Sequence, residues 1–241
     1  MRLILVLAVF LGFWTDQARS NDQCPVPEGM LTPTVGLPNL AQRLKNGQAI
    51  SIVIYGTASI TGAGLGRSGL SFPTRFAEFI KKKYPNKEIT VIVKSRLGET
   101  TAQMVDNLKF QVLSEKPDLV IWQTGSVDVV KNIDINLFGD SLERGLDMLR
   151  EANIDVILID QQYNPHTAPL NNVEEYQDYM EGIAIGRGVL RFSRYDLMRY
   201  WVTSGRFPFN EEKQENRQRV ATELHGCIGW LLSEMVSEAL H

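Results

Sequence analysis

The residues best suited to chemistry in this sequence are a serine early in the chain and a histidine near its end. Ser59 lies in the stretch "SIVIYGTASITGAG", where an apolar, β-branched run stops at Gly56 and small hydroxyl residues follow. This pattern predicts a strand that presents a serine at its end. His225 is the best candidate for a base, because His241 is the last residue and His166 lies in a loop-like "NPH" stretch. A serine hydroxyl and an imidazole are a pair that acyl transfer uses.

Alternating strand and helix patterns must position these residues. Apolar runs rich in β-branched residues predict strands at 49–55, 88–94, 118–123, 155–160 and 189–193. Apolar residues at helical spacing predict helices at 73–85, 100–115, 141–153, within 172–188, and after about residue 226. This alternation implies parallel strands joined by crossover helices. The predicted fold class is therefore α/β, a three-layer α/β/α arrangement around a parallel sheet of five strands.

Ligands of such sheets bind beyond the carboxyl ends of the strands. The segments that follow the first four predicted strands are small or polar: "GTAS", "RLGET", "TGSVD" and "QQYNPH". Aromatic and amide side chains at these strand ends could stack on a sugar and bond its hydroxyls, or they could simply pack the loops. They are Trp122, Gln123, Gln161, Gln162 and Tyr163.

These segments resemble those of the SGNH, or GDSL-type, hydrolases over nearly the whole chain after residue 20. The likeness is closest to an exported bacterial subgroup whose first loop reads Gly-Ser-Ser-Ser-Thr-x-Gly-x-Gly. The resemblance implies a flavodoxin-like sheet and ester hydrolysis, often the deacetylation of carbohydrates. It also implies roles for residues in four short blocks.

The first block of the family places its nucleophilic serine two residues after the glycine that ends the first strand. Aligned without gaps through Gly56, Gly62 and Gly64, that position is Ala58, and the serine stands one step later, at Ser59. Matching "SIT" to the family's Ser-Ile-Thr instead makes Ser59 the nucleophile. Both alignments depart from the family pattern, so the resemblance implies a damaged or rebuilt first block.

Two further blocks supply oxyanion donors in the family. Gly98 of "RLGET" matches the glycine whose N–H joins the oxyanion hole, although a glycine also suits a turn that enters a helix. In "TGSVD", Val127 stands where the family has an asparagine. Valine cannot donate a hydrogen bond, and losing one such donor typically costs about 3–4 kcal/mol of transition-state stabilisation.

The last block, Asp-x-x-His in the family, pairs an acid with the catalytic imidazole. Here "TELH" keeps His225 but has Thr222 in place of the acid. Glu223 is adjacent, yet residues two apart on a helix do not face each other. Asp128, from the third block, is the other candidate for a supporting acid.

The pattern leaves two hypotheses for the function. The first is an ester hydrolase with a rearranged or weakened site that uses Ser59, His225 and the N–H of Gly98. The second is a catalytically inactive relative that keeps the crevice to bind a glycan or a protein partner. A triad acts as a unit, so the losses at Ala58, Val127 and Thr222 weigh against efficient acyl transfer.

The ends of the chain predict export. Arg2 is followed by the apolar run 3–14, and small residues stand at Ala18 and Ser20. This pattern is typical of a signal peptide cleaved after residue 20. The alternative is an uncleaved membrane anchor. An N-terminal strap at 21–38 and a hydrolase-like domain at 39–241 complete the division.

The only two cysteines, Cys24 and Cys227, suggest a disulfide in an exported protein, with two free thiols as the alternative. The expected location is the periplasm or the medium.

Composition and motifs exclude several classes of function. The formal net charge is −3 and the longest basic run is "KKK", which does not suit a nucleic-acid surface. "GAGLGRSG" would need a glycine at Arg67 to be a dinucleotide fingerprint, and no phosphate loop is present. We therefore expect no cofactor and no metal, a carbohydrate or small ester as ligand, and no membrane contact after signal cleavage. The sequence does not fix the oligomeric state.

Overall fold

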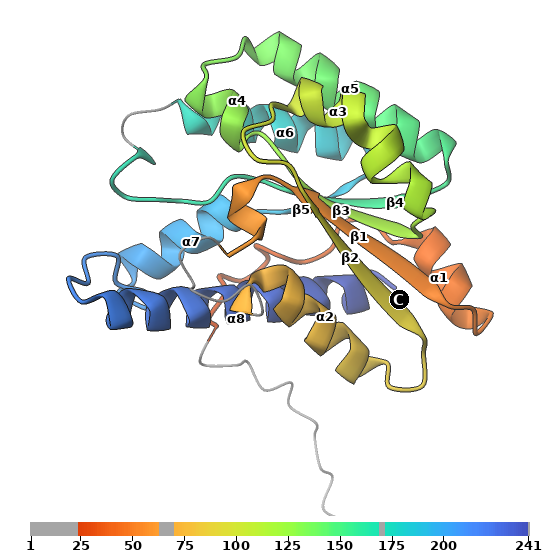
Figure 1. The fold of residues 1–241 in the computed structure, drawn as a ribbon, viewed down its shortest axis with the longest axis horizontal. Helices are drawn as coiled ribbons and strands as arrows, with labels where there is room; N and C mark the ends of the chain where they lie inside the picture. The colour runs from red at the N-terminus through yellow and green to blue at the C-terminus, as the bar shows by residue number, and fades with distance from the viewer. Residues whose placement is uncertain (1–23, 63–69, 169–171, 241) are drawn as a thin grey trace, which may run out of the picture.

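The structure is a computed structural model that describes residues 24–62, 70–168 and 172–240. A single sheet of five parallel strands forms its centre, in the order β2-β1-β3-β4-β5 (Figure 1). The strands are β1 (Ile50–Gly56), β2 (Ile89–Ser95), β3 (Leu119–Gln123), β4 (Asp155–Ile159) and β5 (Leu190–Phe192). The predicted α/β class and the five predicted strands are confirmed. The predicted signal peptide, residues 1–20, lies outside the described residues.

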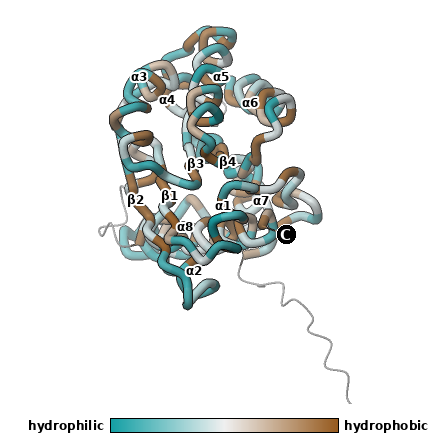
Figure 2. The backbone as a smooth tube through the Cα atoms, turned by 90° about the vertical axis from the view of Figure 1, so that its right-hand side faces the viewer, coloured by the Kyte–Doolittle hydropathy of each residue, from teal (hydrophilic) through white to brown (hydrophobic). Residues whose placement is uncertain are grey.

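Helices cover both faces of the sheet, as Figures 1 and 2 show. One layer contains α3 (Thr101–Gln111), α5 (Ile135–Glu151), α6 (Val173–Arg187) and the short α4 (Ser126–Val130). The other contains α1 (Pro38–Lys45), α2 (Phe72–Lys83), α7 (Arg194–Thr203) and α8 (Gln214–Glu238). Two short 3₁₀ turns, η1 (Ala58–Ile60) and η3 (Leu113–Glu115), complete the elements named here.

The two layers divide the side chains of β1 between two apolar cores. Ile52 and Ile54 pack in the core beneath α2, α7 and α8, while Val53 and Tyr55 pack in the core beneath α3, α5 and α6. All four are fully buried. Successive side chains of a strand point to opposite faces, so a strand covered on both faces must be apolar at every position. This explains the continuous apolar run that predicted the strand.

Two buried carboxylates at the amino ends of the strands hold α1 in place. Asp155 accepts from Asn39 Nδ2 at 3.0 Å and from the backbone N–H of Leu40 at 2.8 Å. Asp118 accepts from Arg43 Nε at 2.6 Å and from the N–H of Ser51 at 2.9 Å. The sequence analysis did not predict α1, whose docking depends on partners more than 70 residues away.

The last helix begins earlier than its predicted start after about Gly226. Helix α8 runs from Gln214 to Glu238, so Gly226 and His225 both lie inside it. Glycine disfavours a helix interior by about 1 kcal/mol, which made Gly226 and Gly229 look like a boundary. Gly229 has a packing role instead: a Cβ there would lie 2.6 Å from Arg75 Cβ and 2.7 Å from the backbone nitrogen of Phe76 in α2.

The predicted disulfide between Cys24 and Cys227 is confirmed. It ties the start of the described chain to α8, and the indole N–H of Trp201 reinforces the attachment by donating to the carbonyl of Pro25 at 2.7 Å. Within the described ranges, no helix has both the length and the apolar character needed to cross a bilayer.

Candidate functional site

Ser59 lies in η1, directly beyond the carboxyl end of β1, and its side chain is half-buried. The strand ends in glycine because the space beside it is filled. A Cβ on Gly56 would lie 2.6 Å from Ile60 Cγ2 and 3.0 Å from Gln123 Oε1. The turn therefore packs tightly against the end of β3, and this packing fixes where the serine hydroxyl points.

The side chain of Gln123, at the end of β3, holds this turn. Its carbonyl oxygen accepts from Thr57 N–H, Thr57 Oγ1 and Ser59 Oγ, each at 3.1 Å, and its Nε2 donates to Ser126 Oγ at 2.9 Å. Gln123 is fully buried. The sequence left open whether this amide binds a sugar or packs the loops. In the structure, it packs the loops.

Arg194, the first residue of α7, reaches the same place from just beyond the end of β5. Its Nη1 donates to Ser59 Oγ at 3.3 Å and its Nη2 to Gln162 Oε1 at 3.2 Å. The guanidinium carbon lies 5.3 Å from the centre of the Phe72 ring. Arg194 is fully buried, and burial lowers its pKa to about 10, which leaves the guanidinium charged at neutral pH.

The sequence analysis did not single out this arginine, which begins an aromatic stretch at 194–202. Most of that stretch packs inside the protein: Tyr195, Leu197, Met198 and Trp201 are buried. The available signal was an arginine placed immediately after "RFS", at the carboxyl end of a predicted strand. A cation at that edge of a parallel sheet lies where ligands bind.

His225 is held by the first turn of α2. Its Nδ1 accepts the backbone N–H of Phe72 at 3.0 Å, and its ring stacks on the Phe72 ring with the centroids 6.0 Å apart. Burial, together with the charge of Arg194, lowers the pKa of His225 to about 3. The imidazole is therefore neutral, and its single proton lies on Nε2 because Nδ1 is the acceptor.

The candidate acids have other partners. Glu223 forms ion pairs with Arg206 at 3.4 Å and with Arg219 at 3.1 Å. Asp128 accepts from the N–H of Thr101 at 3.0 and 3.1 Å and from its hydroxyl at 2.9 Å, and burial raises the pKa of Asp128. Among the described residues, no carboxylate hydrogen-bonds to His225.

The three family positions without catalytic side chains have ordinary structural roles. Thr222, at the acid position, donates its hydroxyl to the carbonyl of Gln218 one turn earlier in α8, at 2.7 Å. Val127 is half-buried in α4, and Ala58 opens η1. Gly98 adopts a left-handed conformation with φ +71° in the exposed turn after β2, and its carbonyl accepts from Lys131 Nζ at 3.2 Å.

The structure thus brings Ser59, Gln123, Arg194 and Gln162 together, and both Arg194 and His225 lie against the ring of Phe72. Among the described residues, Ser59 and His225 form no hydrogen bond with each other. Nor do the described residues contain a group of three or more His, Cys, Asp or Glu side chains that could hold a metal ion.

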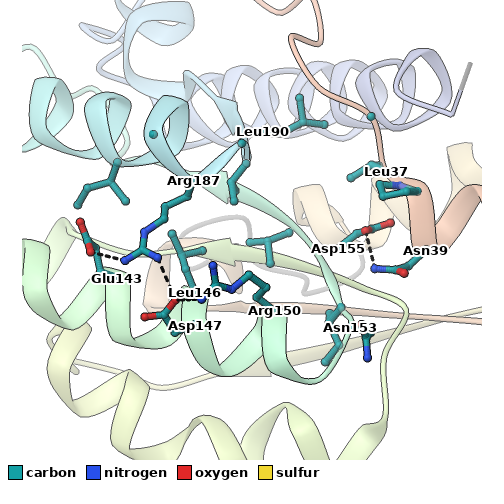
Figure 3. Close-up of a pocket in the computed structure, with 18 of the residues that line it drawn as sticks. Leu37, Asn39, Glu143, Leu146, Asp147, Arg150, Asn153, Asp155, Arg187 and Leu190 are labelled. Atoms are coloured by element: carbon teal, nitrogen blue, oxygen red, sulfur yellow. Dashed lines mark hydrogen bonds and ion pairs between the residues drawn. The ribbon is translucent and has the colours of Figure 1, made fainter.

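A cavity of about 970 Å³ lies at the opposite end of the sheet, at the amino ends of β4 and β5 (Figure 3). Several polar side chains that line it have partners within the lining: Arg187 forms ion pairs with Glu143 and Asp147, and Asp155 accepts a hydrogen bond from Asn39. Ser59, Arg194 and His225 are not among the residues that line this cavity.

Solved structures similar to this chain include proteins described as an esterase and as a lipase. An acetyl xylan esterase, AlAXEase, is 19% identical, with a TM-score of 0.56 and coverage of 72% of this chain and 97% of its own. TesA is 16% identical, with a TM-score of 0.58 and coverage of 77% and 99%. A lipase/acylhydrolase from Enterococcus faecalis is 21% identical, with a TM-score of 0.53 and coverage of 75% and 96%. Comparison with curated proteins gives no match.

Likeness at these identities shows the fold, which is that of SGNH-like hydrolases. The family itself is shown by a family model, described as the non-GDSL lipase-like family, that matches residues 23–241. The altered first block, with Ala58 and Ser59 after Gly56, agrees with that description. The chain therefore belongs to the non-GDSL lipase-like family and has the fold of the SGNH hydrolases.

Proposed function

We propose that this protein is an exported, catalytically inactive relative of the SGNH esterases that binds a polar ligand at the carboxyl ends of β1, β3 and β4. One observation carries the proposal: His225 Nδ1 accepts the N–H of Phe72. A triad histidine donates from one ring nitrogen to an acid and accepts the serine proton at the other. His225 has its acceptor nitrogen facing the backbone and its proton on the remaining nitrogen.

The pKa of His225 supports the same conclusion. A general base works best when its pKa lies near the working pH. At about 3, the pKa of His225 is too low for the ring to take a proton from a serine hydroxyl at neutral pH. The absence of a hydrogen-bond donor on Val127 adds to this, because the oxyanion that acyl transfer forms would lack one ligand.

Export and a carbohydrate-like ligand complete the proposal. The Cys24–Cys227 disulfide is typical of oxidising compartments, and the apolar run at 3–14 is typical of a signal peptide. The half-buried Tyr163, in the segment after β4, provides a ring at this edge of the sheet. One of the similar structures is named an acetyl xylan esterase, which makes acetylated glycans the first ligands to test.

One observation favours a second candidate, a weak esterase that does not use His225. Arg194 Nη1 donates to Ser59 Oγ at 3.3 Å, and a nearby cation favours the alkoxide form of a hydroxyl. Such an enzyme would hydrolyse esters through Ser59 alone.

Ester hydrolysis and fluorophosphonate labelling of the purified protein separate these possibilities. We expect no labelling of Ser59, and p-nitrophenyl acetate turnover at the level of Ser59→Ala and His225→Gln variants that remain folded. If the parent protein is labelled and hydrolyses the ester, and both activities are lost in Ser59→Ala and in His225→Gln, the site is a serine–histidine pair and the proposal is overturned. If both activities are lost in Ser59→Ala but kept in His225→Gln, the proposal is overturned in favour of the second candidate.

A further inference from the structure

The charge of Arg194 has no carboxylate in contact with it. Among the described residues, no Asp or Glu lies within ion-pair distance of this guanidinium, and its Nε has no hydrogen-bond partner. The nearest candidate, Asp160, accepts from Arg191 Nη2 at 2.7 Å and from the N–H of Tyr195 at 2.9 Å. The internal segments 63–69 and 169–171 contain no acidic residue. Asp160 offsets the charge of Arg194 only from a longer distance, and Arg191 shares that carboxylate, so an anion in direct contact with the guanidinium of Arg194 would stabilise it further.

The groups around Arg194 can donate to such a counter-charge. Ser59 has a hydroxyl proton, and neutral His225 carries its proton on Nε2. The hydroxyl proton is free to turn, because Gln123 Oε1 keeps two other donors, the N–H and the hydroxyl of Thr57. A turned hydroxyl would therefore leave no buried acceptor unsatisfied.

The present partner of Arg194 Nη2 is replaceable. Gln162 Oε1 is a neutral acceptor on an exposed residue, so its side chain can move into solvent at little cost. A charge-assisted hydrogen bond from a guanidinium is stronger than one to a neutral amide. An anionic oxygen in place of Gln162 Oε1 would improve the contacts of Arg194.

An independent feature of the same edge also lacks a partner. Gln161, which follows Asp160 after β4, is 4% exposed, and neither its amide oxygen nor its amide nitrogen has a hydrogen-bond partner among the described residues. Its Nε2 lies 2.8 Å from where a Cβ on Gly125 would stand. This amide is therefore available to a ligand that reaches the carboxyl ends of β3 and β4.

We propose that the crevice beside Ser59 binds a carboxylate group, which replaces Gln162 Oε1 on Arg194 Nη2 and accepts the hydroxyl proton of Ser59. This inference names the ligand class of the binding site proposed above and rests on that proposal. A single guanidinium, whose charge Asp160 already offsets in part, matches a monoanion better than a phosphate dianion, which would leave excess negative charge buried. The carboxylate could belong to an acidic sugar or to an acyl chain.

The test is a titration of the intact, disulfide-bonded protein with acetate and with its neutral isostere acetamide. The NMR shifts of the backbone amides of Ser59 and Phe72 report the binding. We expect a dissociation constant at least tenfold smaller for acetate. Ser59→Ala and Arg194→Met should each weaken acetate binding at least fivefold, and the exposed substitution Gln162→Ala should leave it unchanged or tighter. Galacturonate and butyrate, compared in the same way, distinguish a sugar from an acyl chain as the source of the carboxylate.

Three results would overturn the inference: equal affinity for acetate and acetamide, acetate binding that survives Ser59→Ala, or tighter binding of inorganic phosphate than of acetate. Ser59→Ala keeps the test decisive if Arg194→Met does not fold. The readout is independent of hydrolysis. If the protein hydrolyses esters through Ser59 and His225, the proposal that it is catalytically inactive is refuted. If it neither hydrolyses esters nor binds acetate, only the proposed ligand class is refuted.

Discussion

Replacing Gly229 by alanine is expected to lower the free energy of unfolding by about 1–3 kcal/mol, the usual cost of overpacking. Helix α8 approaches α2 most closely at this glycine. A Cβ at 229 would lie 2.7 Å from the backbone nitrogen of Phe76 and 2.8 Å from the carbonyl oxygen of Phe72. Backbone atoms cannot rotate out of the way, so the two helices must separate.

Gly226, three residues earlier in the same helix, provides the matched control. No atom lies within 4 Å of the position that its Cβ would take. Alanine there removes the conformational cost of a glycine inside a helix, so we expect stability unchanged or raised by up to about 1 kcal/mol. Urea unfolding of both variants measures the difference. If Gly229→Ala were as stable as Gly226→Ala, the described packing of α2 on α8 would be wrong.

The second large effect is a loss of stability in acid. Because burial and Arg194 hold the pKa of His225 at about 3, only the unfolded chain takes up this proton as the pH falls below the ordinary histidine value of about 6.5. The unfolded state then binds more protons, and the free energy of unfolding falls with the pH. Between pH 7 and pH 4 this group alone should remove about 3 kcal/mol.

A His225→Gln variant isolates this contribution, because glutamine does not titrate and can still accept the N–H of Phe72. The pH dependence of its stability should be about 3 kcal/mol smaller over the same interval. The exposed His166→Gln variant should behave like the parent. Asp160 acts in the opposite direction: burial raises its pKa to about 6, so its contribution is lost as the pH rises through that value. Asp160 is present in every variant, so its contribution to the pH dependence of stability cancels when the variants are compared. Parallel pH profiles of the parent and His225→Gln would contradict the described environment of His225.

Most of the fold could be predicted from local patterns. The strands are apolar and β-branched because both of their faces are covered, and that requirement is written in consecutive residues such as Ile52, Val53 and Ile54. Helix boundaries were harder to predict where long-range packing decides them. Gly226 resembles a helix end in isolation, whereas the close approach of α2 at Gly229 shows that the helix continues past it for packing.

The candidate site was only partly predictable, for the same physical reason. The sequence shows that Val127 and Thr222 cannot act as oxyanion donor and acid. It does not show which ring nitrogen of His225 faces a donor, because the N–H of Phe72 lies 153 residues away in the chain. Nor does it show that the side chain of Arg194 reaches Ser59, 135 residues away. Contacts at such separations appear only when the sheet is assembled.

The protonation of His225 is the most direct test of whether the crevice can run serine–histidine chemistry. A long-range ¹H–¹⁵N NMR correlation spectrum of the imidazole, recorded from pH 5 to pH 8, reports which ring nitrogen carries the proton and whether the ring titrates. We expect a neutral ring throughout, with the proton on Nε2 and with Nδ1 as the acceptor. A proton on Nδ1, or a titration midpoint near neutral pH, would mean that His225 can serve as a general base and would contradict the account.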